Sequence, residues 1–148
     1  MTEATSGRIK SSQSRPKDGL FFELSGGPDA PVAARRAVLA GEEKTPGVQM
    51  PESVREDVLL LVSELVTNAV RHAGVGPEHS LQTDIRWRPG WVRVEVTDPS
   101  TGSASIGARS EGDGSGGFGL FLVEQIADRW GVRRTPAGTS VWFELVSE

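Results

Sequence analysis

The sequence contains no cysteine, so disulfide bonds and thiolate metal sites are excluded. Its formal net charge is -4, which leaves no basic footprint for a nucleic acid. The chain also lacks any run of about 18 apolar residues and any signal-peptide pattern, the features of membrane-spanning and exported chains. We therefore expect a cytoplasmic protein that contacts neither a membrane nor a nucleic acid directly.

The length and patterning of the chain suit one domain. Its 148 residues are enough to bury a substantial core. Residues 1–19 are polar and without periodicity, which predicts a disordered arm before a domain at 20–148. The patterning predicts a loop at 42–50, helices at 31–40, 51–73 and 118–130, and strands at 20–24, 81–87, 91–97, 132–135 and 139–146. We expect an α+β fold, a two-layer α/β sandwich with helices on one face of a mostly antiparallel sheet.

The predicted helix at 51–73 carries a polar stripe on an otherwise apolar sequence. Glu64 and Asn68 are four residues apart and therefore share a face, and Arg71 and His72 extend the stripe. A carboxylate can accept a proton, and an amide oxygen can hold a hard cation such as Mg²⁺. The alternative is that these side chains form the solvated side of an amphipathic helix.

Two further segments favour a nucleotide site. The predicted strand at 91–97 is followed by Asp98, a carboxylate placed to read a base, and then by a turn. Residues 112–119 are rich in glycine and run directly into the next predicted helix. Glycines let backbone amides approach phosphates closely, and a helix N-terminus attracts negative charge.

Other interpretations of the glycine-rich segment fit less well. A dinucleotide fingerprint needs an apolar strand before it, whereas residues 103–111 are polar and small. A P-loop needs Lys and Ser or Thr after its last glycine, whereas Gly119 is followed by Leu120. A flexible linker stays open as an alternative.

The order of these motifs resembles the ATP-binding domain shared by gyrase, Hsp90, histidine kinases and MutL (the GHKL superfamily). Within it, residues 61–73 and 117–132 look most like the stand-alone anti-sigma-factor serine kinases of the RsbW and SpoIIAB type, in their actinobacterial branch. The resemblance covers roughly residues 21–145. It implies the Bergerat-type ATP-binding fold.

The resemblance also implies roles for particular residues. Asn68 would supply its side-chain oxygen to Mg²⁺, and Glu64 would orient or deprotonate an attacking serine hydroxyl. Asp98 would accept a hydrogen bond from the adenine amino group, which selects ATP over GTP. Ser140, with Thr139 adjacent, would support Asp98 through water. The remaining expected nucleotide contacts are Gly102, Gly114, Gly116, Gly117, Phe118, Gly119 and Leu120.

Two departures from the family pattern affect the expected affinity. The turn after the aspartate usually reads Asp-x-Gly-x-Gly; here Ser100 replaces the first glycine, while Gly102 keeps the second. Ser100 reduces backbone freedom, which predicts weaker nucleotide binding. Thr139 occupies a position that is often Lys, which removes one positive charge near the site.

The two histidines and the tryptophans are expected to have structural roles. His79 lies among Gly, Pro and charged residues and should be at the surface. His72 is expected to pack at the helix end. Core or strand-pair packing is expected for Trp87, Trp91, Trp130 and Trp142.

We therefore expect an ATP- and Mg²⁺-dependent protein serine kinase that acts as a regulatory switch. By resemblance, it would bind a sigma factor in one state and phosphorylate a small antagonist, an anti-anti-sigma protein of STAS type, in the other. The resemblance also implies a possible homodimer. The alternatives are a non-catalytic, nucleotide-gated binding module and a simple ATPase that uses water as its acceptor.

Overall fold

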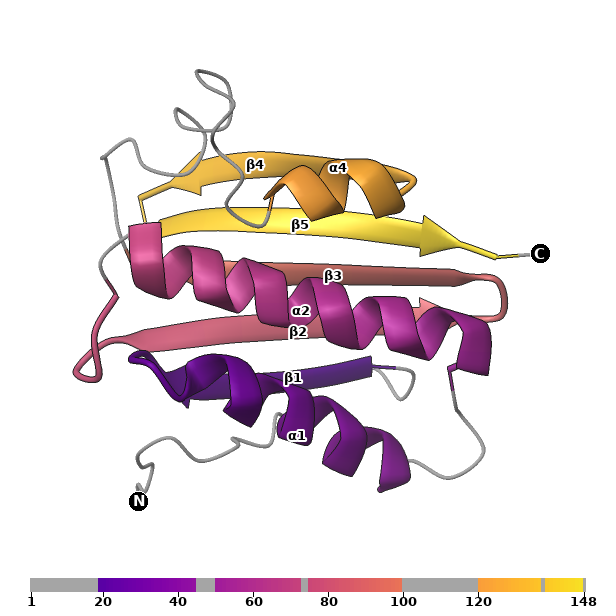
Figure 1. Cartoon of the computed structure of the whole chain (residues 1–148), viewed down its shortest axis with the longest axis horizontal. Coiled ribbons are helices and arrows are strands. Elements are labelled where there is room, and N and C mark those ends of the chain that lie inside the picture. Colours follow the sequence, from indigo (N-terminus) through magenta and orange to yellow (C-terminus); the bar gives the residue numbers. More distant parts are fainter. Residues whose placement is uncertain (1–18, 45–49, 73–74, 100–119, 137, 148) are drawn as a thin grey trace.

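Helices cover one face of a single antiparallel sheet (Figure 1). The computed structural model describes residues 19–44, 50–72, 75–99, 120–136 and 138–147. Within these residues the sheet has five strands in the order β1-β2-β3-β5-β4. The strands are β1 (Gly19–Ser25), β2 (Ser80–Arg88), β3 (Trp91–Asp98), β4 (Arg129–Thr135) and β5 (Gly138–Val146). The helices are α1 (Ala30–Glu43), α2 (Glu52–His72) and α4 (Leu120–Ile126).

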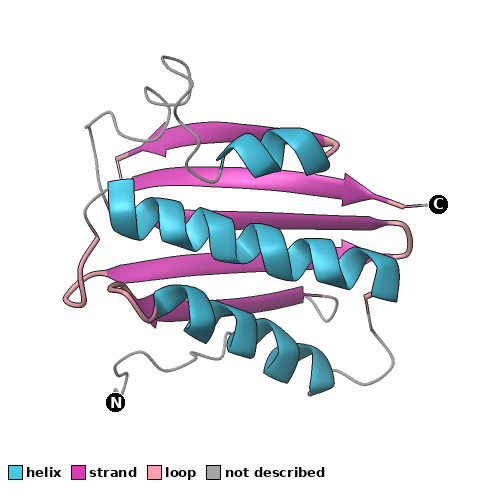
Figure 2. Cartoon of the chain, viewed as in Figure 1, coloured by secondary structure: helices cyan, strands magenta, loops and turns pink. Residues whose placement is uncertain are grey.

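The two-layer arrangement confirms the predicted fold class (Figure 2). Every strand pairs antiparallel with its neighbours. Alternate residues of the central strands are buried, as in β3, where Val92, Val94, Val96 and Asp98 are buried and their neighbours are half-exposed. Since side chains alternate along a strand, one face of the sheet meets the helices and the other does not.

The core lies between α2 and the sheet. The buried side chains of α2 recur at helical spacing along its 21 residues, from Val54 through Val58, Leu61 and Leu65 to Ala69. Against them pack the buried side chains of the sheet, including Trp87 and Phe143. None of the described helices is both long and apolar enough to cross a membrane.

Helix α1 extends beyond the predicted range of 31–40. It continues to Glu43, so the first two residues of the predicted loop at 42–50 are helical. Glu42 is 4% exposed, and its carboxylate accepts hydrogen bonds from the Arg55 guanidinium of α2 and from the Met50 N–H. Sequence periodicity does not show this partner, because Arg55 lies 13 residues away.

The predicted helix at 118–130 is wrong at its C-terminal end. Helix α4 stops at Ile126, and Arg129 and Trp130 belong to β4. The Asp128 N–H donates to the Glu144 carbonyl, and the Asp128 carboxylate accepts a hydrogen bond from the Val146 N–H. These bonds begin the pairing of β4 with β5. The spacing of apolar residues in this part of the sequence is also compatible with a helix, so the sequence alone did not show where α4 ends.

At the N-terminus, β1 begins at Gly19, one residue before the predicted strand at 20–24. Residues 1–18 of the predicted arm lie outside the described residues. Trp87 is in the core and Trp130 packs against it, which confirms their structural role. Likewise His79 is at the surface.

Candidate functional site

The predicted site residues of α2, β3 and β5 come from one end of the molecule. In Figure 1 the C-terminal end of α2, the end of β3 and the start of β5 all lie at the left-hand end of the sheet. Helix α2 packs against both β3 and α4. The helical stripe and the strand-end aspartate, which are about 30 residues apart in the sequence, are thus carried on contacting elements.

Asn68 is a buried polar residue of α2. Its residue is 2% exposed, and its side-chain nitrogen is buried with no hydrogen-bond partner among the described residues. A buried polar group without a hydrogen-bond partner lowers the free energy of unfolding by about 1–3 kcal/mol. We therefore expect a ligand to supply the partner of this amide. Turning the amide by 180° exchanges its nitrogen and oxygen, so the same side chain can present either a donor or an acceptor to a ligand.

Glu64 lies one helical turn before Asn68 and is half-buried. The two side chains share a face of α2, as their spacing predicts. Arg71, near the end of the same helix, is exposed. The backbone of His72 ends the helix, and its side chain lies outside the described part of the structure.

Asp98 is the last residue of β3 and is only 2% exposed. It belongs to the buried set of alternating residues, so its side chain is on the helix-facing side of the sheet. A buried carboxylate at the end of a strand is suited to bind one specific hydrogen-bond donor of a ligand.

The strand register separates the two neighbouring hydroxyls of β5. Thr139 is the cross-strand partner of Asp98, whereas Ser140 is the partner of Thr97. The Ser140 and Thr97 hydroxyls are 2.7 Å apart and hydrogen-bond to each other on the opposite face of the sheet. The position beside Asp98 on the helix-facing side therefore belongs to Thr139 and not to Ser140.

Gly138 allows β5 to approach the end of β3 closely. Its φ angle is 151°, and a Cβ atom built on it would overlap the carbonyl oxygen of Asp98. Only glycine fits this position without moving one of the two strands. Gly138 thus permits the close approach of β5 to the Asp98 backbone.

Most of the predicted phosphate-binding segment lies outside the described residues. This applies to Ser100 and to Gly102, Gly114, Gly116, Gly117, Phe118 and Gly119. Leu120 begins α4 and is 4% exposed within the core, so any contact that it makes with a ligand would involve its backbone.

The described residues include no group of three or more His, Asp and Glu side chains that could bind a metal. A Mg²⁺ ion at this site would thus depend on the Asn68 amide and on oxygen atoms of the ligand and water. Such a sparse protein contribution suits Mg²⁺, which usually keeps several waters and is bound together with substrate phosphates.

A comparison with protein families agrees with this geometry. The sequence model of the histidine kinase-like ATPase domain matches residues 28–145. The chain belongs to this family. It therefore carries a histidine kinase-like ATPase domain, an ATP-binding domain, and the resemblance to the GHKL superfamily is confirmed.

A solved structure supports the same fold. The histidine kinase domain of a blue-light activated histidine kinase from Erythrobacter litoralis matches with a TM-score of 0.51 and 22% sequence identity. The match covers 79% of this chain and 60% of that chain, so this ATPase domain spans less than two thirds of the protein it matches. No curated protein matched the sequence.

Proposed function

We propose that the chain is an ATP- and Mg²⁺-dependent protein serine kinase of the anti-sigma-factor type. The observation that carries the proposal is the placement of half-buried Glu64 one helical turn before buried Asn68, on a helix that packs against the strand of Asp98. The Asn68 amide nitrogen has no hydrogen-bond partner among the described residues. Membership of the histidine kinase-like ATPase family supports ATP as the nucleotide.

Asn68 would hold Mg²⁺ through its side-chain oxygen. The bound ion would supply positive charge to the triphosphate. Glu64, one turn earlier, would hold the acceptor serine hydroxyl and take its proton. The hydroxyl oxygen then bonds to the γ-phosphorus while the bond to the bridging oxygen of ADP breaks, and ADP leaves with the electron pair. Help from a general base of this kind is worth about 10²- to 10⁴-fold in rate.

Asp98 would select adenine. Its carboxylate accepts a hydrogen bond from the adenine amino group, whereas guanine presents a carbonyl oxygen at the same place. Two opposed acceptors in a buried site can discriminate by up to about 10⁴-fold. Thr139, beside Asp98 in the register, is the hydroxyl best placed to support this contact.

The acceptor serine would belong to a partner protein. The resemblance to the RsbW and SpoIIAB group favours an anti-anti-sigma protein of STAS type as phosphate acceptor, and a sigma factor as the protein held in the other state. A non-catalytic module would bind ATP and a partner without phosphotransfer. A simple ATPase would hydrolyse ATP with no partner present.

Calorimetry with ATP and GTP in the presence of Mg²⁺ tests the nucleotide site. We expect the wild type to bind ATP selectively, and Asn68→Ala and Asp98→Asn to lose most of the affinity. Comparable binding of GTP would contradict the role of Asp98, and wild-type affinity in Asn68→Ala would contradict the role of Asn68.

Phosphotransfer from labelled ATP to a STAS-type protein tests the catalytic role of Glu64. We expect Glu64→Gln to bind ATP normally and to transfer phosphate at least about 10²-fold more slowly. Glu56→Gln is the matched control, because Glu56 is an exposed glutamate on the same helix. A wild-type rate in Glu64→Gln would show that Glu64 is not the base.

A further inference from the structure

The edge strand β4 carries an exposed arginine at the same end of the sheet as Asp98. Arg134 of β4 is the cross-strand partner of Thr139, and Thr139 is the partner of Asp98. Residues directly opposite in an antiparallel pair have their side chains on the same face. The three residues therefore form one row across the neighbouring strands β3, β5 and β4, on the side of the sheet that faces the helices.

The rest of β4 confirms the face to which Arg134 belongs. Trp130 and Val132 precede it at two-residue spacing, and both pack against the buried core. Since side chains alternate along a strand, Arg134 is on the same, helix-facing side. Arg133 is on the opposite side, where its guanidinium donates to the Glu95 carboxylate at 2.8 Å. The two adjacent arginines are thus separated by the sheet.

Arg134 also differs from the other arginines of the sheet in having no partner among the described residues. It is exposed, and its side chain makes no hydrogen bond or ion pair with any of them. Every other arginine of the five strands has a charged or aromatic partner. These are Arg86, Arg88, Arg93, Arg129 and Arg133. A guanidinium is always charged and only donates hydrogen bonds, so Arg134 is available to an anionic ligand.

The nucleotide needs positive charge that the other assigned side chains do not supply. Its triphosphate is strongly negative, whereas Glu64 and Asp98 carry carboxyl groups and Asn68 is neutral. Neighbouring strands are about 4.8 Å apart, so the backbone of Arg134 is about 10 Å from that of Asp98 across the row. From there a long arginine side chain can turn over Thr139 toward a nucleotide whose base is bound by Asp98.

We propose that Arg134 is a nucleotide-binding residue that pairs with the phosphate groups of ATP. The proposal rests on the ATP site of the proposed function and does not depend on phosphotransfer. The guanidinium donates two parallel hydrogen bonds to phosphate oxygens, a geometry that lysine does not offer. Arg134 therefore adds affinity for ATP and none for adenosine. In this it differs from Asp98, which contacts the base.

NMR titrations of the labelled protein with ATP and with adenosine test this role, because they also measure weak binding. We expect Arg134→Ala to bind ATP with Mg²⁺ about 10- to 100-fold more weakly than the wild type, as for the loss of hydrogen bonds to a charged group. Its affinity for adenosine should stay within about twofold of the wild type. Arg134→Lys should recover part of the ATP affinity, because it keeps the charge and loses the planar fork.

Arg133→Ala is the matched control, because it removes the same charge from the next residue on the opposite face. It should bind both ligands like the wild type, and circular dichroism confirms that each variant is folded. Wild-type ATP affinity in Arg134→Ala would overturn the proposal. So would an equal loss for ATP and adenosine, which would place Arg134 at the base, or an equal loss in Arg133→Ala.

The same titrations separate a failure of this proposal from a failure of the proposed function. A wild type that binds neither ligand would overturn the nucleotide site as a whole, and the role of Arg134 with it. Loss of both ligands in Asp98→Asn, together with an ATP affinity that is unchanged in Arg134→Ala, would overturn the role of Arg134 alone. Phosphotransfer is not part of this measurement, so an error in the kinase assignment would not appear as an error in the role of Arg134.

Discussion

At the scale of single residues, the sharpest distinction is between the adjacent hydroxyls of Thr139 and Ser140. Both residues are buried, at 1% and 3% exposure, so burial does not tell them apart. The register does, because only Thr139 pairs with Asp98 on the helix-facing side. The Ser140 hydroxyl is already bonded to Thr97 on the other face.

We therefore predict that Thr139→Val weakens ATP binding about tenfold, the effect of losing roughly one hydrogen bond to a charged group. Ser140→Ala should leave the affinity within about twofold of the wild type. Calorimetric titration of both variants with ATP and Mg²⁺ measures the difference. The opposite order of effects would show that Ser140 supports the nucleotide site.

The sequence predicts how Glu64 and Asn68 lie relative to each other, but it does not show which hydroxyl lies beside Asp98. The shared face of Glu64 and Asn68 follows from helical spacing alone, because residues four apart on a helix lie on one side of it. The choice between Thr139 and Ser140 depends on which face of β5 meets the helices. A strand of alternating side chains has two possible orientations, and only its pairing with β3 decides between them.

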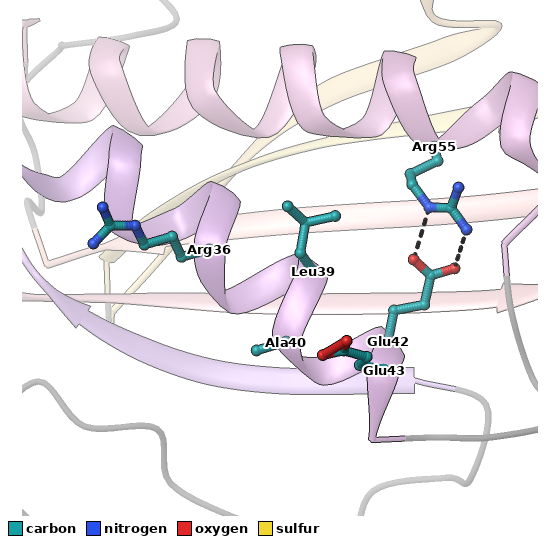
Figure 3. Close-up of a pocket in the computed structure, with 6 residues that line it drawn as sticks. All are labelled: Arg36, Leu39, Ala40, Glu42, Glu43 and Arg55. Carbon is teal, nitrogen blue, oxygen red and sulfur yellow. Dashed lines mark hydrogen bonds and ion pairs between the residues drawn. The ribbon is translucent and has the colours of Figure 1, made fainter.

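At the scale of elements, a partly buried ion pair joins the end of α1 to the start of α2. Figure 3 shows the Arg55 guanidinium facing the Glu42 carboxylate, with two bonds of 2.8 and 3.1 Å. The Met50 N–H adds a third bond at 2.7 Å. The pair borders a hollow of about 470 Å³ that is also lined by Arg36, Leu39, Ala40 and Glu43.

Burial of Glu42 alone would raise its pKa, but the hydrogen bonds from Arg55 and Met50 outweigh burial and hold the pKa below its ordinary value of 4.5. The carboxylate therefore stabilises the folded state fully above about pH 4.5. That stability is lost as the pH falls through the lower, folded-state pKa, because the unfolded chain takes up the proton first.

We predict that Glu42→Gln lowers the free energy of unfolding by about 1–3 kcal/mol at pH 7. The difference in the free energy of unfolding between Glu42→Gln and the wild type should shrink as the pH falls below about 4.5. At such a pH the Glu42 carboxyl of the unfolded wild type is protonated, so it is neutral like the glutamine of the variant. Urea unfolding at a series of pH values measures it. Glu78→Gln is the control, because the Glu78 side chain is 73% exposed. A difference that does not change with pH would mean that the Glu42 charge contributes nothing.

The same elements show where sequence prediction of the fold stops. The alternating strands and the three predicted helices, together with the family resemblance, were enough to predict two layers and an antiparallel sheet. The ends of α1 and α4 were not predictable, because each is set by a distant partner. Arg55 fixes Glu42 in the last turn of α1, and pairing with β5 converts residues 129–130 from a possible helix into a strand.

At the scale of the whole molecule, ligand binding and stability are coupled through Asn68. The buried amide nitrogen of Asn68 has no hydrogen-bond partner among the described residues, and this unfavourable term ends when an acceptor atom of a ligand pairs with it. Any ligand that binds only the folded chain raises its stability, by about 2.7 kcal/mol at a concentration of 100 times Kd.

We predict that ATP with Mg²⁺ at this concentration raises the Tm of the wild type by roughly 6–12 °C, as expected for a chain of this size. In Asn68→Ala the shift should nearly disappear, because the nucleotide loses its bound cation. In Glu64→Gln the shift should persist, because a group that receives the serine proton contributes to transfer and not to holding ATP. GTP should give no comparable shift. Scanning calorimetry of the three proteins decides the matter, since a shift lost equally in both variants would make Glu64 a nucleotide ligand and leave the kinase without its base.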